Sequence, residues 1–235
     1  MAGAVTLGAW RTAVRFNTEG IFIKVSGVTS EEDALFSIGL GASAIGFEFG
    51  PTARRITPSA AHDIVRRLPV GALSVGVFTS ELPQKVVEVT NTLGLSAAQL
   101  DGAFSASAIE WVAERVTTVI RSFRRADDVR SAPAIDGVDY FLLPEDDDVY
   151  ALEDCLEIFA DLSIPTPLIA SGGLNATNVV QVVQNFPIWG VDVRAGVEAE
   201  PGLKDPVQLG EFIANARWAS ENAYVSRQRE EWRNF

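Results

Sequence analysis

Short apolar runs rich in β-branched residues alternate with longer helical patterns along nearly the whole chain. Eight runs have the length and composition of buried parallel strands. They are Ile21–Ser26, Ala44–Phe49, Leu73–Phe78, Ala97–Leu100, Thr117–Phe123, Val138–Leu143, Pro167–Ala170 and Gly190–Val193. Successive strand–helix units with right-handed crossovers predict an α/β fold, a single (β/α)8 TIM barrel, with a doubly wound open sheet as the alternative.

Helical patterns separate these runs. They cover Ser30–Ile38, Pro58–Leu68, Pro83–Leu93, Ser105–Glu114, Tyr150–Leu162, Ala176–Asn185 and Pro206–Ala219, with a short further helix around Ala126–Arg130. Ser30 and Thr57 are typical N-cap residues, and Pro58 suits a first helical position. We expect an N-terminal extension over residues 1–20, the barrel over 21–217 and a C-terminal helical extension over 218–235.

Composition and charge narrow the classes of partner. With 235 residues, 47% of them hydrophobic, the chain can bury one large core. A formal net charge of −12 argues against nucleic acid and anionic membranes as partners, since no basic stripe offsets phosphate repulsion. No apolar run is long enough to span a bilayer and no signal peptide is evident, so we expect a cytoplasmic protein. The single cysteine, Cys155, excludes a disulfide within one chain and is expected in the core.

Two glycine turns follow the last two predicted strands. Gly172 and Gly173 come after the seventh, and Ala195 and Gly196 come after the eighth. Neighbouring turns of this kind can aim backbone N–H groups at one anion, as many barrels do with a phosphate. The ligand class that we expect is therefore a phosphorylated small molecule.

Polar side chains occur within the predicted strands. Alternation puts Lys24 and Ser26 on one face of the first, Glu48 opposite Phe47 and Phe49 on the second, Gln99 with Asp101 near the fourth, and Asp192 with Arg194 on the eighth. Helices cover the outside of a barrel, so unpaired charge is costly on either face. These residues are expected to pair with one another or with a ligand, and a structural Lys24–Glu48 ion pair is the alternative to a functional role.

Several strings resemble phosphoribosylanthranilate isomerase, in order and at matching spacing. They are Ile23–Thr29, Ala44–Phe49, Thr52–Pro58, Ser74–Phe78, Ala98–Gly102, Ser171–Leu174 and Gly190–Glu198, and Glu200–Pro206 is similar to the family's segment before its last helix. The resemblance covers residues 21–217. It implies a (β/α)8 barrel, a phosphate-binding cup made by Gly172, Gly173, Ala195 and Gly196, and an arginine, Arg54, facing the anthranilate carboxylate.

The chain departs from the family pattern at both proton-transfer positions. The family catalyses an Amadori rearrangement with a cysteine base on the first strand and an aspartate acid at the end of the sixth. Ser26 stands at the cysteine position and Pro144 at the aspartate position, with the acidic run Glu145–Asp148 after it. A serine hydroxyl without a base partner is not appreciably ionised near neutrality, so Ser26 cannot simply substitute for the cysteine.

Other groups in the strands are candidates for the missing roles. Asp101, Glu48 and Asp192, together with Ser26, form a possible catalytic set, while Lys24, Arg54, Arg194 and Gln99 are expected to bind substrate. Arg194 replaces a small hydroxyl residue of the family, and it either binds an anion or neutralises Asp192. No metal site or cofactor is expected, because the acidic run lacks the spacing and glycine of a calcium loop.

Two functions remain open. The first is an isomerase-like enzyme that kept the phosphate cup, acquired new proton-transfer groups and catalyses a changed reaction, not an efficient phosphoribosylanthranilate isomerase. The second is a noncatalytic binding or partner protein derived from the isomerase. Trp10 and Phe16 of the N-terminal extension could cover the bottom of the barrel. The aromatic, charged C-terminal extension could pack on a second subunit in a homodimer, or on its own barrel.

Overall fold

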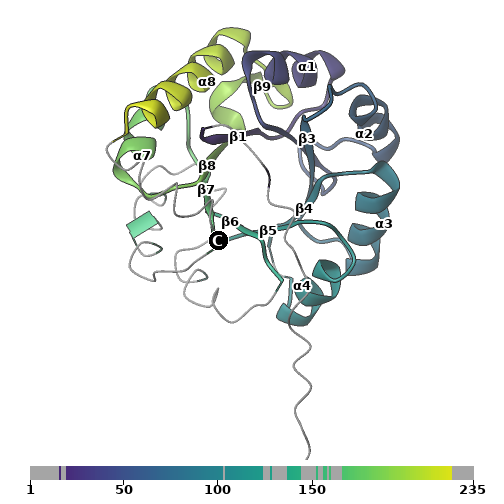
Figure 1. Cartoon of the computed structure of the whole chain (residues 1–235). Helices are drawn as coiled ribbons and strands as arrows, with labels where there is room; N and C mark the ends of the chain where they lie inside the picture. Colours follow the sequence, from purple (N-terminus) through teal and green to yellow (C-terminus); the bar gives the residue numbers. More distant parts are fainter. Residues whose placement is uncertain are drawn as a thin grey trace, which may run out of the picture.

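Eight parallel strands close into a barrel in the computed structural model, which describes residues 16, 20–102, 104–123, 128, 137–143, 152, 156–157, 159 and 166–223. The strands are β1 (Phe22–Val25), β2 (Ala44–Glu48), β3 (Leu73–Phe78), β4 (Ala97–Leu100), β5 (Val119–Ser122), β6 (Tyr140–Leu142), β7 (Leu168–Ala170) and β8 (Gly190–Val193). Each strand pairs with its neighbours in chain order, and β8 pairs with β1 (Figure 1). The predicted TIM barrel is confirmed, and the open sheet is excluded.

The described helices surround the barrel (Figure 1). They are α1 (Glu31–Leu40), α2 (Pro58–Val65), α3 (Pro83–Leu93), α4 (Ala106–Ala113), α7 (Val179–Asn185) and α8 (Pro206–Glu221). Side chains of Ser30, Thr57 and Asp205 accept hydrogen bonds from backbone N–H groups in the first turns of α1, α2 and α8. Short polar residues at these positions satisfy N–H groups that have no partner within the helix.

Some predicted helix bounds were wrong. The helix expected from Ala176 begins at Val179, because the Asn175 side chain accepts hydrogen bonds from the backbone of Thr177 and Asn178 and holds a turn there. The helix expected to reach Leu68 ends at Val65. At the other end of the barrel sequence, α8 continues to Glu221, beyond the predicted Ala219. The segments Ala126–Arg130 and Tyr150–Leu162 lie largely outside the described residues, as does Cys155.

The core has two parts. Apolar side chains on the outer face of the strands pack against the helices, as Ile23, Ile45 and Phe47 do. Inside the barrel, at the end where the strands begin, aromatic rings of Phe16, Phe22, Tyr140 and Trp189 pack together with centroids 4.6–6.5 Å apart. The backbone N–H of Phe16 donates a hydrogen bond of 2.9 Å to the Tyr140 hydroxyl.

Phe16 thus closes the bottom of the barrel, as the sequence indicated, whereas Trp10 lies outside the described residues. A short hairpin of β9 (Glu198–Glu200) and β10 (Leu203–Lys204) follows β8 and leads into α8. This hairpin was not predicted from the sequence. Among the described helices, none combines the length and apolar character that crossing a membrane requires.

Candidate active site

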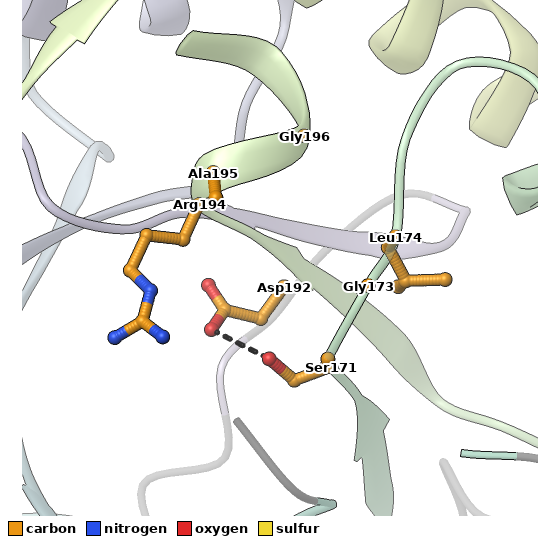
Figure 2. Close-up of a pocket in the computed structure, with 8 residues that line it drawn as sticks. Ser171, Gly173, Leu174, Asp192, Arg194, Ala195 and Gly196 are labelled. Atoms are coloured by element: carbon orange, nitrogen blue, oxygen red, sulfur yellow. Dashed lines mark hydrogen bonds between the residues drawn. The ribbon is translucent and has the colours of Figure 1, made fainter. Parts of the chain in front are cut away.

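Four polar side chains meet inside the barrel at the ends of β1, β7 and β8. Lys24 and Asp192 form an ion pair of 2.9 Å, and both are buried. Ser26 accepts a hydrogen bond of 2.5 Å from Lys24 Nζ and donates one of 2.7 Å to Asp192 Oδ1. Ser171 donates to the other carboxylate oxygen, Oδ2, over 3.2 Å (Figure 2). Asp192 is therefore held by a cation and two hydroxyl donors.

The strand register explains this arrangement. Lys24 lies directly beside Asp192 in the β1–β8 ladder, so two inward side chains meet across neighbouring strands. Gly46 on β2 leaves the space that they need. A Cβ atom at Gly46 would lie 2.7 Å from Ser26 Oγ and 3.3 Å from Lys24 Cε, too close for either group to stay in place.

Glu48 contacts Arg194 and Thr52 rather than Lys24. Its Oε1 accepts a hydrogen bond of 3.4 Å from Arg194, and its Oε2 accepts one of 2.5 Å from Thr52. The Lys24–Glu48 ion pair proposed as an alternative was wrong, because Lys24 is in register with Ala44 and Glu48 lies four residues further along β2. Arg194 lies beside Asp192 at the end of β8 (Figure 2). Its guanidinium pairs with Glu48.

A second ionic cluster flanks the mouth of the barrel. Arg54 donates to Glu198 through both Nε and a terminal nitrogen, at 2.7–3.0 Å, and Lys204 Nζ donates to the same carboxylate over 2.8 Å. Burial alone would raise the pKa of Glu198, but the hydrogen bonds from Arg54 and Lys204 outweigh it, and the pKa lies below its usual value. Burial lowers the pKa of Lys204, against the opposing effect of Glu198.

The turns after β7 and β8 line a pocket, formed by Ser171, Gly172, Gly173, Leu174, Asp192, Arg194, Ala195 and Gly196 (Figure 2). Gly172 and Gly173 have φ angles of 80° and 61°, a left-handed conformation that other residues rarely adopt. A Cβ atom at Gly196 would lie 1.9 Å from the Leu174 carbonyl oxygen, so the two turns touch. The four residues predicted to form the phosphate cup therefore share one pocket, with the Asp192 carboxylate in its wall.

Gln99 and Asp101 lie on and just after β4, and both are buried. Among the described residues, neither the amide nitrogen nor the amide oxygen of Gln99 has a hydrogen-bond partner. A buried amide without a partner costs free energy, which a ligand or water can recover. Gln99 stays a predicted substrate-binding residue, and Asp101 a predicted catalytic one.

Four residues that contribute to the site were not singled out in the sequence. They are Thr52, Ser171, Glu198 and Lys204. Three of them fall inside strings that matched the family, and Lys204 falls inside the Glu200–Pro206 segment. The sequence therefore drew attention to these positions, but it did not indicate which groups they contact.

Pro144 and Glu145–Asp148 lie outside the described residues. Within the described residues, no group of three or more His, Cys, Asp or Glu side chains could hold a metal ion.

Known proteins of one family are similar to this chain over most of its length. A family model for N-(5'-phosphoribosyl)anthranilate (PRA) isomerase matches residues 23–215. The N-(5'-phosphoribosyl)anthranilate isomerases of Thermotoga petrophila and Desulforudis audaxviator are 35% and 34% identical to this chain, over 83% and 84% of it and 98% of each relative.

Solved structures of the same family are also similar to this chain. Phosphoribosyl anthranilate isomerase from Thermotoga maritima matches with 34% identity and a TM-score of 0.73, over 84% of this chain and 99% of that one. A phosphoribosyl anthranilate isomerase in complex with reduced 1-(o-carboxyphenylamino)-1-deoxyribulose 5-phosphate matches with 35% identity and a TM-score of 0.72, again over 84% and 99%. Family match, identity and fold all extend over most of the sequence, and the chain belongs to the phosphoribosylanthranilate isomerase family.

Proposed function

We propose that this barrel is an isomerase-type enzyme that binds a phosphorylated sugar or a phosphoribosyl-amine and uses altered proton-transfer groups for a changed reaction. The observation that carries the proposal is the Ser26 hydroxyl, which lies between Lys24 Nζ at 2.5 Å and Asp192 Oδ1 at 2.7 Å. Ser26 occupies the position at which the family resemblance implies a cysteine base. Its direct hydrogen bond to a carboxylate supplies the base partner that an isolated serine lacks.

The contacts define a route for one proton. Ser26 Oγ takes a proton from the substrate carbon while its own hydrogen passes to Asp192 Oδ1, and the reverse transfer returns a proton to the product. The Lys24 ammonium group, whose Nζ lies 2.5 Å from Ser26 Oγ, stabilises the negative charge that develops there. This makes Ser26 and Asp192 the proposed proton-transfer pair, with Lys24 as an electrostatic partner.

The neighbouring pocket supports a phosphorylated ligand. Its glycine turns present backbone to one small space, and Asp192 lies in the same wall, so a bound phosphate would hold a sugar next to the proton-transfer pair. We also propose that Arg54, which the family resemblance puts opposite a carboxylate, recognises an acidic group at the other end of the ligand while Glu198 holds its guanidinium. The second proton-transfer group is assigned to Glu48 or Asp101, which are buried near the same ends of the strands.

The test is a fluorescence assay of phosphoribosylanthranilate turnover by the unmodified chain, by Ser26→Ala and by the double variant Ser26→Cys with Pro144→Asp. Loss of a general acid or base costs about 10²- to 10⁴-fold, so we expect the unmodified chain to be slow and the double variant to be faster. Asp63→Asn, an exposed substitution on α2, is the control for a change of charge.

Each outcome decides between the candidate functions. Turnover by the unmodified chain at ordinary enzyme rates would make it a phosphoribosylanthranilate isomerase and would overturn the changed reaction. Calorimetry with ribose 5-phosphate and inorganic phosphate tests the cup separately, and an intact fold that binds neither would overturn phosphate recognition. Binding without turnover of any phosphoribosyl-amine, in the chain and in the double variant, would favour the noncatalytic protein.

A further inference from the structure

Lys204 lies on β10, and its side chain is fully buried at the mouth of the barrel. Its ammonium group donates to the Ser26 carbonyl oxygen over 2.6 Å, to the Arg194 carbonyl oxygen over 3.3 Å and to Glu198 Oε1 over 2.8 Å. An ammonium group has three hydrogens, so these contacts use all of its donors. Lys204 therefore joins three points of the structure, namely the backbone of Ser26, the backbone of Arg194 and the side chain of Glu198.

Two of those points are the ends of the strands that carry the proposed proton-transfer pair. The β1–β8 ladder runs to Val25 and Val193, and Ser26 and Arg194 are the next residues on each strand. Their carbonyl oxygens converge on Lys204 Nζ, which joins the strands beyond their last paired residues. Arg194 leads directly into Ala195 and Gly196 of the phosphate cup, so the same contact sets where the cup lies relative to Arg54, although Lys204 itself does not line the cup.

The third point is Glu198, which orients Arg54. Glu198 receives three hydrogen bonds from Arg54, and its Oε1 is also held by Lys204 and, at 3.3 Å, by the backbone N–H of Gly202. The backbone N–H of Lys204 donates to Asp33 Oδ2 over 3.3 Å, which ties β10 to α1. The Arg54 guanidinium thus has a defined position relative to the strand ends.

We propose that Lys204 is a positioning residue that sets the separation between the phosphate cup and Arg54, and that it thereby selects ligands with a phosphate at one end and a carboxylate at the other. This inference rests on the proposed function for its ligand class. A cation anchored to both ends of the site fixes a distance, and a fixed distance discriminates between ligands by length and by the charge at the far end.

The experiment compares three probes by calorimetry: inorganic phosphate, reduced 1-(o-carboxyphenylamino)-1-deoxyribulose 5-phosphate, and the same compound without its ring carboxylate. In the unmodified chain, we expect the carboxylate to improve affinity by about tenfold, the gain from a charge-assisted contact. In Lys204→Met that gain should fall to less than about threefold, while the affinity for inorganic phosphate stays within about threefold. Lys85→Met, an exposed lysine substitution on α3, is the matched control and should change neither.

Glu198→Gln is a second variant that keeps the contacts from Lys204 to both carbonyl oxygens. It should lose the preference for the carboxylate as Lys204→Met does, and combining the two substitutions should cost no more than either alone. The proposal is overturned if Lys204→Met keeps the full preference, or if it weakens all three probes equally, which is the result of a purely structural role.

Hydrogen exchange of the Arg54 Nε–H tests the same inference without any ligand. The signal is assigned by its loss in Arg54→Lys, and its exchange should become about tenfold faster in Lys204→Met and stay unchanged in Lys85→Met. Unchanged exchange in Lys204→Met would overturn the positioning role. If the unmodified chain binds none of the probes while exchange responds as expected, the proposed function fails and the positioning role stands.

Discussion

At the scale of single residues, Glu198 should stabilise the fold by an amount that depends on pH. Hydrogen bonds from Arg54 and Lys204 hold the pKa of Glu198 below its ordinary value of 4.5 despite burial. A carboxyl whose folded pKa is depressed contributes stability that is present above the unfolded pKa and is lost as pH falls through the folded pKa. Glu198 should therefore stabilise the fold at neutral pH and cease to do so in acid.

Glu198→Gln tests this dependence. At pH 7 the variant should be less stable by on the order of 2 kcal/mol, because the buried Lys204 and the partly buried Arg54 keep only a neutral partner. That difference should shrink as pH is lowered below about 4.5, where the carboxyl takes up a proton in the unfolded chain, and it should disappear once pH falls below the depressed pKa of the folded chain. Urea unfolding across this range is the measurement, with exposed Glu211→Gln as the control. A difference that stays constant with pH would contradict the ionic role.

Residue by residue, the sequence allowed the face of each side chain to be predicted but not its partner. Alternation along a strand puts Lys24, Ser26 and Asp192 on the inner face from local information alone. Which of the inward groups meet depends on the stagger between strands, which places Lys24 beside Asp192 and four residues away from the level of Glu48. Lys204 was missed for the same reason, since its three partners are brought together only by barrel closure and the β9–β10 hairpin.

At the scale of elements, the turns after β7 and β8 depend on each other. Gly196 packs against the Leu174 carbonyl oxygen so closely that a Cβ atom would lie 1.9 Å from it. Gly196→Ala must therefore push the two turns apart. We expect phosphate binding to weaken by at least about tenfold and the fold to lose about 1–3 kcal/mol, as when a packed site is overfilled.

Gly210→Ala is the matched control, because Gly210 lies in α8 and a Cβ atom added to it would have nothing within 4 Å. Alanine there should stabilise the helix by about 0.5–1 kcal/mol and leave phosphate affinity unchanged. Calorimetry with inorganic phosphate and thermal unfolding measure both variants. Unimpaired phosphate binding by a folded Gly196→Ala protein would show that the cup does not hold the anion.

At the scale of the whole molecule, aromatic side chains fill one end of the barrel, and the polar groups of the candidate active site lie at the other end. Aromatic rings of Phe16, Phe22, Tyr140 and Trp189 fill the interior where the strands begin, while Lys24, Ser26 and Asp192 lie where the strands end. Active sites of such barrels lie at the carboxyl ends of the strands, and packing at the opposite end serves stability. Stability and ligand binding should therefore be separable by substitution at the two ends.

Phe16→Ala tests that separation, because Phe16 comes from outside the strands and stacks on Phe22 and Tyr140 with centroids 5.6 and 5.1 Å away. Removing a buried ring leaves a cavity, and the free energy of unfolding should fall by about 3–5 kcal/mol. Phosphate affinity of the folded protein should stay within about threefold of the unmodified chain, since no cup residue moves. Urea unfolding and calorimetry on the same sample give both quantities. Weaker phosphate binding in a variant that remains folded would mean that closure at the bottom sets the geometry of the mouth, and the two ends would then have to be treated as one coupled unit.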